Sequence, residues 1–302
     1  MNRKYQEKNG YVLITPAKNE EDFIGLTIES ILIQTILPKK WTIVSDGSTD
    51  TTDHIIEKYA EKYRFIQLVR KPNAENRNFG SKVKAFNTGV KQLGTLKYNY
   101  IGNLDADVSF DKDYYECILK EFERNHKLGI AGGIIKGLIN DKYYNQNISL
   151  DSVAGAVQLF RKECFEVIGG GYLPLEHGGE DTAAEILARS HGYQVRTFED
   201  LNVYHHRRVA SQAGNILQAK FRQGVSFYRL GYHPIFQFIK CLYRITDRPF
   251  LLSSFLVLIG YLWGAFKNDE MSLPEKAIKY LRYEQLRKVK LDFKIIQKKM
   301  DT

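Results

Sequence analysis

Two aspartates, Asp105 and Asp107, directly follow the apolar run 98–104. Residues i and i+2 of an extended segment point to opposite sides, so one carboxylate can bind a metal while the other reaches a ribose or a water ligand. A hard divalent cation held by carboxylates offsets the negative charge that collects on a nucleotide diphosphate leaving group. The pair therefore predicts a metal-dependent nucleotide diphosphate site.

A second acidic group, Asp46, ends the apolar run 41–45 and begins the sequence DGSTD. Such a sequence also suits a turn in which Thr49 or Asp50 caps the next helix. We expect capping from one of those two residues. Asp46 differs because it lies at the carboxyl end of a strand, where it can accept a hydrogen bond from a base N–H or a ribose hydroxyl.

The segment 177–181, HGGED, is the third candidate. Transfer of a group to a hydroxyl with inversion needs a carboxylate that takes the hydroxyl proton, and a glycine-rich loop can bring one close to the reacting carbon. The alternative is that Glu180 and Asp181 only favour the positive N-terminus of the following helix. The metal site expected upstream favours catalysis.

The fourth candidate is the segment 204–208, YHHRR. A neutral imidazole can complete a metal shell, and arginines bind phosphate oxygens. A histidine pair can equally be structural or solvated. Neighbouring residues of a strand face opposite ways, so at most one of His205 and His206 should be a ligand.

Apolar runs alternate with helical periodicity in the part of the chain that carries these groups. Strands are expected at 11–15, 41–45, 65–70 and 98–104, with helices at 21–34, 50–63 and 79–93 between them. This alternation indicates a parallel sheet with crossover helices. Ligands bind outside the carboxyl ends of such strands, so residues 18–20, 46–48 and 105–107 should converge on one site.

Beyond residue 107 the pattern predicts a mixed extension of the sheet. Helices are expected at 113–125 and 181–190, and strands at 130–139, 153–160, 193–198 and 203–206. After residue 212 the sequence is typical of helices to its end.

These motifs together resemble glycosyltransferase family 2. The resemblance covers about 11–208 and rests on PAKNE at 16–20, DGSTD at 46–50, K-x-K-A-x-N-x-G at 82–89, the Asp105/Asp107 pair and GED at 179–181. It implies the glycosyltransferase A fold, an α/β Rossmann-like fold in which helices flank a mixed, mainly parallel sheet. A catalytic domain at 1–211 would comprise a nucleotide-binding half, about 1–110, and an acceptor half, about 111–211. A helical C-terminal region, 212–302, would follow.

The resemblance also implies how the donor is bound. Pro16, Ala17, Glu20 and Asp46 would line the nucleoside pocket. Lys84 would face the diphosphate of a nucleotide-diphosphate sugar.

The same resemblance implies the metal ligands and the base. Asp105 would approach the ribose and the metal, and Asp107 would be the main ligand of Mn2+ or Mg2+. His205 or His206 would be a further contact of the metal or the diphosphate. Asp181 would be the general base, and Glu180 would lie beside it.

The expected activity is an inverting, metal-dependent transfer of a sugar to the hydroxyl of a saccharide or lipid-linked acceptor, in cell-surface polysaccharide or glycolipid synthesis. Processive members of the family carry a Q-x-x-R-W motif. The most similar segment of this sequence, KFRQG at 220–224, does not match it. Non-processive transfer is therefore expected.

Two other functions fit parts of the pattern. A nucleotidyltransferase on a related α/β scaffold would need a glycine-rich, basic loop directly after the first strand, and residues 16–20 contain no glycine. A non-catalytic nucleotide-sugar-binding protein would not need both Asp107 and Asp181, which are present.

The composition narrows the partners and the compartment. A formal net charge of +9 attracts nucleic acid, anionic lipid or phosphorylated small molecules, but no nucleic-acid-binding motif accompanies it, so nucleic acid is not an expected partner. The three cysteines are far apart, which indicates reduced thiols. The first residues lack the apolar core of a signal peptide, so a cytoplasmic catalytic domain is expected.

The most apolar segment is 249–266, at the lower edge of the length that a membrane span requires. A span would separate the basic tail from the catalytic domain, which the positive-inside tendency disfavours. Peripheral contact with the inner face of the membrane through about 228–266 is expected instead. The alternative is a buried core helix or a dimer interface, and the sequence leaves the oligomeric state open.

Overall fold

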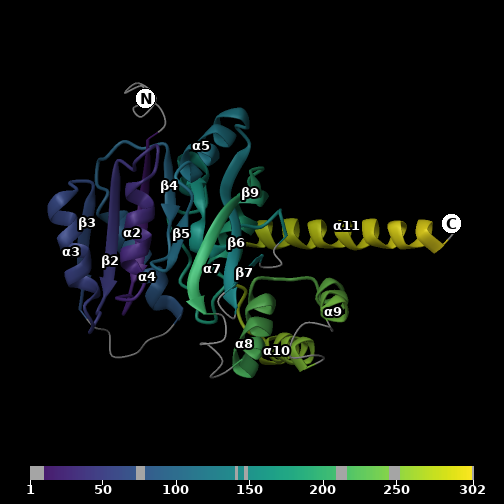
Figure 1. Ribbon diagram of the computed structural model, residues 1–302. Helices are drawn as coiled ribbons and strands as arrows, with labels where there is room; N and C mark the ends of the chain where they lie inside the picture. The colour runs from purple at the N-terminus through teal and green to yellow at the C-terminus, as the bar shows by residue number, and fades with distance from the viewer. Residues whose placement is uncertain are drawn as a thin grey trace. The chain divides into compact units, whose positions relative to one another are not determined.

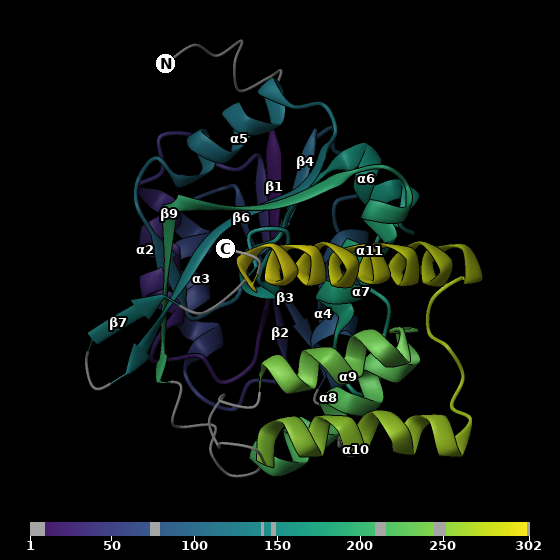
Figure 2. The same ribbon diagram turned by 90° about the vertical axis from the view of Figure 1, so that its right-hand side faces the viewer.

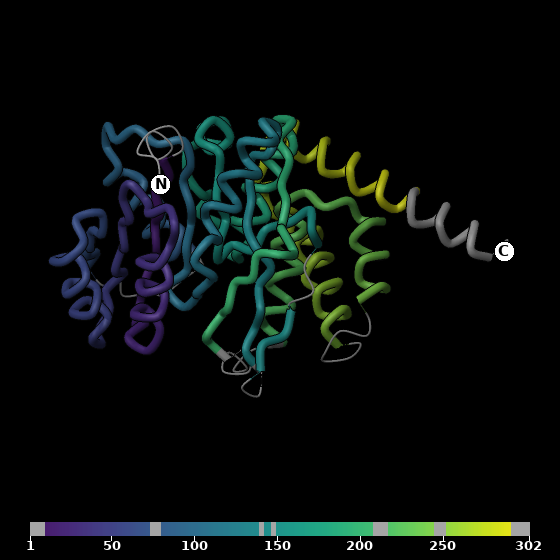
Figure 3. The backbone as a smooth tube through the Cα atoms, turned by 45° about the horizontal axis from the view of Figure 1, so that its top comes forward, coloured from purple at the N-terminus to yellow at the C-terminus, as the bar shows by residue number. Residues whose placement is uncertain are grey.

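The computed structural model describes residues 10–72, 79–139, 142–145, 149–208, 216–244 and 252–300. The chain forms two compact units (Figure 1). The first comprises Met1–Glu176 and Glu180–Ser211, and the second comprises Gln212–Thr302 together with the short segment His177–Gly179. In Figure 3 the second unit takes the green-to-yellow end of the colour range.

The first unit begins with a parallel sheet and crossover helices, as predicted. Strands β1 (Tyr11–Ala17), β2 (Lys40–Asp46), β3 (Ile66–Lys71) and β4 (Tyr100–Asn103) alternate with helices α2 (Ile24–Leu32), α3 (Thr52–Lys62) and α4 (Phe79–Lys91). β1 lies between β2 and β4, and β3 pairs with the outer edge of β2. The carboxyl ends of these strands therefore lie along one edge of the sheet.

The remaining strands extend this sheet into a mixed one, which confirms the predicted fold class. They are β5 (Val108–Phe110), β6 (Leu128–Ile139), β7 (Lys142–Asn145), β8 (Leu159–Arg161) and β9 (Gln194–Arg208). The strand order is β3-β2-β1-β4-β8-β6-β9-β5, and β7 pairs with β6. β8 is antiparallel to both β4 and β6, whereas β6 and β9 are parallel. The further helices of this unit are α5 (Tyr114–Arg124), α6 (Lys162–Val167) and α7 (Glu180–Ser190).

Three details of the extension differ from the sequence prediction. Residues 153–158 form no strand and include a short 3-10 helix at Gly155–Val157, so only Leu159 and Phe160 of the predicted strand belong to β8. Gly155 passes so close to Asp181 that a Cβ there would lie 3.0 Å from Oδ2. The strands predicted at 193–198 and 203–206 are one strand, β9, whose pairing with β6 shifts register at Gly133/Ile134 and so accommodates the polar residues between them. The short strands β5 and β7 were not predicted.

A continuous apolar core holds the edge of the sheet in place. Helix α2 contributes Ile24, Ile28 and Ile31, which share one helical face and are fully buried. Polar atoms at this core are paired near β1 and β2: Trp41 Nε1 donates to Thr15 Oγ1 at 2.9 Å, and the Tyr11 hydroxyl donates to the Ile36 carbonyl at 2.7 Å. Satisfied polar groups in a packed core define a single register for β1 and β2.

The second unit is helical, as predicted. It contains α8 (Ile216–Arg229), α9 (Pro234–Tyr243), α10 (Leu252–Lys267) and α11 (Glu275–Met300), of which α8, α9 and α10 are drawn together in Figure 2. α8 and α10 approach closely at glycines. A Cβ on Gly260 would lie 2.0 Å from the Phe221 carbonyl oxygen, and one on Gly224 would lie 2.0 Å from the Val257 carbonyl oxygen. Only residues without a side chain permit this contact.

The apolar segment 249–266 coincides largely with α10, and its residues 249–251 lie outside the described residues. One side of α10 is buried at Val257 and Tyr261, whereas Phe255 is 60% and Phe266 81% exposed. Within the described part of the chain, no helix combines the length and apolar character needed to cross a membrane.

Candidate active site

The acidic groups predicted from the sequence lie along the carboxyl edge of the parallel sheet. Register pairs Ala17 with Ser45 across β1 and β2, and Ile14 with Asn103 across β1 and β4. The segments that follow these strands, with Glu20, Asp46 and Asp105, therefore begin at the same edge, as the rule for parallel sheets requires.

Asp105 is fixed by its backbone and paired through its side chain. Its N–H donates to the Ala156 carbonyl at 2.9 Å, and Lys82 Nζ on α4 lies 2.7 Å from Oδ1. Burial lowers the pKa of Lys82, but the nearby carboxylate of Asp105 outweighs it, so the pKa of Lys82 is raised. Lys82 is therefore a permanent positive charge at the sheet edge.

Asp107 is more deeply buried, at 7% exposure, and interacts with two cationic groups. Arg207 Nε lies 3.0 Å and His205 Nε2 3.4 Å from Oδ2. Burial alone raises the pKa of Asp107, but His205 and then Arg207 outweigh it and lower this pKa to about 2. Asp107 is thus ionised throughout the physiological range.

Arg207 links Asp107 to Glu20, whose carboxylate also pairs with the guanidinium. Burial, and then the charge of Asp107, raise the pKa of Glu20 to about 7, although Arg207 opposes the shift. Glu20, Asp107 and Arg207 therefore form one electrostatic cluster. The sequence implied roles for both acids but not that Arg207 bridges them.

The two adjacent histidines face opposite sides of β9. His205 faces Asp107, and this hydrogen bond raises the pKa of His205. His206 instead bonds through Nδ1 to the Tyr143 hydroxyl at 3.0 Å and through Nε2 to Ser109 Oγ at 2.9 Å. Of the two candidate histidines, His205 is therefore the one whose ring faces Asp107, whereas both ring nitrogens of His206 have other partners.

A pocket of about 250 Å³ lies between α4 and α7. It is lined by Lys82, Val83, Phe86, Asn103, Gly155, Tyr172, Glu180 and Asp181. Asp181 and Glu180, in the first turn of α7, thus share a pocket with the lysine that pairs with Asp105. Burial, and then the charge of Asp181, raise the pKa of Glu180.

A network of buried polar side chains lies next to this pocket. Glu185, on the same helix as Asp181, accepts hydrogen bonds from Ser152 Oγ at 3.0 Å and from the Val153 N–H at 2.7 Å. Gln158 lies 3.4 Å from Glu185 and accepts from the Tyr172 hydroxyl at 2.5 Å. The network connects the helix of Asp181 to the turn that carries Gly155.

The other predicted residues lie elsewhere on the edge. Asp46 is 6% exposed and pairs with Lys71 Nζ at 2.8 Å, and it is not among the residues that line the pocket. Ala17 packs into the core, whereas Pro16 pairs in register with Val44 within the sheet and is partly exposed.

Lys84 is exposed and lies two residues beyond Lys82 on α4. Residues two apart on a helix are about 200° apart, so these two lysines do not share a face. The K-x-K motif contained the signal for Lys82, but choosing between its lysines requires the rotation of the helix, which the sequence does not show.

The residues beside Asp107 fit a divalent cation as a partial shell. Among the described residues no three His, Cys, Asp or Glu side chains lie close enough together to hold a metal. Asp107 Oδ2 and His205 Nε2 lie 3.4 Å apart and pair with each other, so a cation bound by both would replace the proton between them. Mg2+ is commonly held by one or two carboxylates, with substrate phosphates completing the shell.

The family model described as glycosyl transferase family 2 matches residues 12–173, more than half of the chain. The chain belongs to this family. Poly-beta-1,6-N-acetyl-D-glucosamine synthase of Staphylococcus aureus (strain MSSA476) is 28% identical over 209 residues, 63% of this chain and 48% of the relative. The enzyme of the same name from Staphylococcus epidermidis is 26% identical over 64% of this chain and 49% of the relative. This family 2 glycosyltransferase thus spans about half the length of the curated relatives it matches.

Solved structures show the same fold. S. aureus TarS 1–349 in complex with UDP-GlcNAc has a TM-score of 0.53 at 15% identity, covering 85% of this chain and 73% of that chain. The mannosyltransferase PcManGT from Pyrobaculum calidifontis, in complex with GDP-Man and Mn2+, has a TM-score of 0.55 at 17% identity, covering 87% and 76%. The likeness to these two structures agrees with the predicted fold.

The buried carboxylate of Glu185 leads to a prediction on stability. Burial raises the pKa of Glu185 to about 7, above its usual value, so the folded chain binds a proton there that the unfolded chain releases. The contribution of Glu185 to the free energy of unfolding is therefore largest below the ordinary glutamate pKa. It falls by about 2–3 kcal/mol as the pH rises through 7. Urea unfolding at pH 5 and pH 7.5 should show a smaller loss for Glu185→Gln than for the natural chain. Equal losses would mean that Glu185 is ionised in the folded state at pH 5.

Proposed function

We propose that this chain is an inverting, metal-dependent, non-processive glycosyltransferase that moves a sugar from a nucleotide-diphosphate sugar to an acceptor hydroxyl. One observation carries the proposal. The pocket between α4 and α7 places the carboxylate of Asp181 in the same space as Lys82, which pairs with Asp105 at the edge of the sheet. A base and a phosphate-binding cation thus line the same pocket.

The donor diphosphate lies, in this proposal, against Lys82 and beside Asp107. Asp107 and His205 would hold Mn2+ or Mg2+, with Asp105 nearby. When bound, the cation offsets the charge that develops on the departing nucleotide diphosphate. Lys82 donates to phosphate oxygens in exchange for part of its pairing with Asp105. Two structural neighbours were solved with UDP-GlcNAc and with GDP-Man and Mn2+, which supports a nucleotide-sugar donor and a divalent metal.

Asp181 acts as the general base in the transfer step. Its carboxylate takes the proton of the acceptor hydroxyl, whose oxygen forms a bond to the anomeric carbon. The bond from that carbon to the phosphate oxygen breaks on the opposite face, and the nucleoside diphosphate leaves with the electron pair. A single displacement inverts the anomeric configuration. Phe86 and Tyr172 provide apolar walls that exclude water from the reacting carbon.

The nucleoside is assigned to the edge formed by Pro16, Ala17, Glu20 and Asp46. The backbone after β1 would contact the base, because the Ala17 side chain lies in the core. Asp46 would accept hydrogen bonds from the base or the ribose, in competition with Lys71. Between the two lysines of α4 we assign the diphosphate to Lys82 rather than Lys84.

The acceptor is proposed to be a saccharide or a lipid-linked saccharide at the inner face of the membrane, with no role for nucleic acid. The relatives' name, which specifies a polymer of N-acetylglucosamine, supports a role in polysaccharide synthesis. Peripheral membrane contact through 228–266 is supported by exposed apolar side chains on α9 and α10, namely Ile235, Phe238, Leu242, Phe255, Leu262, Trp263 and Phe266. Residues 245–251 of that segment lie outside the described residues.

Asp181→Asn tests the base. The amide keeps the shape of the side chain but cannot accept the proton, so transfer should fall by about 10²–10⁴-fold while donor binding is retained. Initial rates with a nucleotide-sugar donor and titration of the nucleoside diphosphate measure the two quantities. Asp200→Asn, an exposed acid on β9, is the matched control and should leave both unchanged. Normal turnover by Asp181→Asn would exclude Asp181 as the base.

The two histidines of β9 form a matched pair for the metal site. His205→Ala should weaken Mn2+-dependent binding of a nucleoside diphosphate by about tenfold or more, because it removes a side chain beside Asp107. His206→Ala should leave that binding within about twofold, since its ring bonds to Tyr143 and Ser109. Titrations with and without Mn2+ measure this. The reverse order of effects would contradict the assignment of His205.

The two lysines of α4 form a second matched pair. Lys82→Met should weaken nucleoside diphosphate binding about tenfold or more through loss of a charge-assisted contact. Lys84→Met removes the same charge two residues away and should change affinity by less than about twofold if only the general field of the protein is altered. Equal losses in the two variants would show that the field, and not contact with Lys82, attracts the diphosphate.

A further inference from the structure

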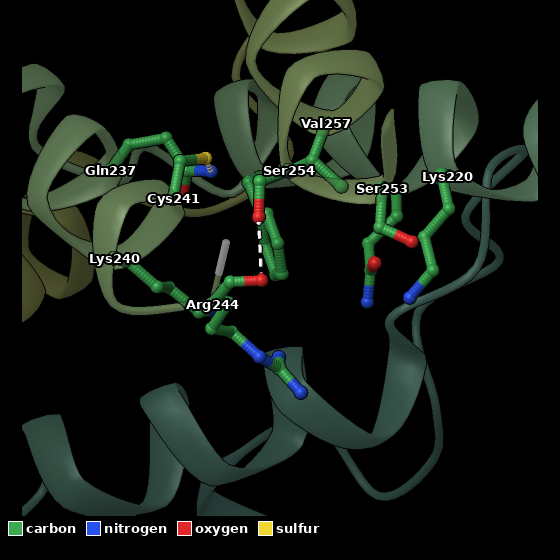
Figure 4. A pocket seen from close by; sticks show the side chains of 10 residues that line it. Lys220, Gln237, Lys240, Cys241, Arg244, Ser253, Ser254 and Val257 are labelled. Carbon is green, nitrogen blue, oxygen red and sulfur yellow. Dashed lines mark hydrogen bonds between the residues drawn. The ribbon is translucent and has the colours of Figure 1, made fainter. Parts of the chain in front are cut away.

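A second pocket, of about 310 Å³, lies wholly within the helical unit and shares no residue with the proposed active site. Three helices line it (Figure 4). α8 contributes Lys220, Gln223 and Phe227, whose spacing of three and four residues places them on one helical face. α9 contributes a similar face that includes Gln237 and Lys240.

The charged groups of this pocket are all positive. Lys220, Lys240 and Arg244 line it, and no carboxylate does so among the described residues. Lys240 Nζ lies 3.9 Å from the centre of the Phe227 ring and 5.0 Å from that of Tyr232. Burial, and then the charge of Arg244, lower the pKa of Lys240 to about 8. Burial and the neighbouring positive charge both destabilise the charged form of this lysine. An anion bound in the pocket would offset both effects.

The polar groups of the pocket complement these cations. Gln237 is fully buried, and its Nε2 donates to Cys241 Sγ at 3.3 Å while its Oε1 has no hydrogen-bond partner. A buried amide oxygen without a partner is unfavourable, so it calls for a hydrogen-bond donor from a ligand. Ser253 and Ser254 lie in the first turn of α10, where the positive end of the helix dipole favours an anion.

We propose that the pocket between α8, α9 and α10 binds a phosphate ester that also carries hydroxyl groups, such as glycerol phosphate or the headgroup of phosphatidylglycerol. The phosphate oxygens accept from Lys220, Lys240 and the first turn of α10. A ligand hydroxyl donates to Gln237 Oε1.

The same helices carry features that connect the pocket to a lipid source. The face of α9 opposite the pocket exposes Ile235, Phe238 and Leu242, which are 58%, 51% and 52% accessible. Apolar residues with a neighbouring basic site are the combination by which a peripheral helix binds an anionic bilayer. A soluble phosphate ester carries the same phosphate and hydroxyl groups as a lipid headgroup. An experiment must therefore distinguish the soluble ligand from the lipid.

The test measures ligand binding and not sugar transfer, so it stays informative if the proposed function fails. Calorimetric titration of the full chain with glycerol 3-phosphate reports the soluble source. Co-flotation with vesicles of phosphatidylcholine, with and without phosphatidylglycerol, reports the lipid source. Lys240→Met and Lys220→Met remove pocket charges on two different helices. Lys279→Met, on α11, removes the same charge from an exposed lysine that pairs with Glu275.

Binding in either arm, weakened about tenfold or more by Lys240→Met and Lys220→Met but less than about twofold by Lys279→Met, supports the pocket and identifies its source. Thermal melts confirm that each variant is folded, and the use of two helices keeps the test valid if one variant is not. The proposal is overturned if the natural chain binds neither ligand. It is also overturned if the three lysine variants lose vesicle binding equally, because general attraction of a basic protein to the bilayer would then explain the result.

Discussion

The proposed active site depends on compensation of clustered negative charge. Glu20, Asp105 and Asp107 meet at one edge of a parallel sheet, and their repulsion would be severe in a partly buried setting without cations. The chain supplies those cations from distant positions. Lys82 on α4 pairs with Asp105, and Arg207 on β9 pairs with both Glu20 and Asp107. The cations keep Asp107 ionised, whereas burial and the charge of Asp107 raise the pKa of Glu20 despite Arg207.

The backbone pairing of β9 brings these cations to the carboxylates. β9 is long and irregular, and its register shifts against β6 bring the end that contains His205 and Arg207 to the segment after β4. The His206 N–H donates to the Asp107 carbonyl at 2.9 Å, which fixes β9 beside the aspartate. Side chains alternate along the strand, so His205 and Arg207 lie on one face of β9 and His206 lies on the other. Backbone pairing at the sheet thus determines which cation reaches which carboxylate.

Sequence reasoning located the strand ends because apolar runs that end in acids or small polar residues are a local signal. Asp46, Asp105 and Asp107 were found this way. The sequence pointed to Lys84 for the diphosphate and left the choice between His205 and His206 open, because each choice depends on the rotation of a helix or the side of a strand. The segment 153–158 was predicted as part of a strand for a related reason. Its apolar residues are buried, but the close approach of Gly155 to Asp181 is visible only in three dimensions.

The two pockets have opposite electrostatic designs, and this argues for different ligands. The pocket beside Asp181 combines carboxylates with a single lining lysine, so a ligand there must bring its own cation or exchange with Lys82. Among the described residues, the pocket of the helical unit is lined by lysines and an arginine but by no carboxylate. Its buried Gln237 Oε1 has no hydrogen-bond partner and can accept from a donor on the ligand. A metal-bound diphosphate carries reduced charge and suits the first, whereas a bare phosphate ester keeps its charge and suits the second. Differences in charge compensation therefore allow one chain to distinguish two phosphorylated ligands without a common binding motif.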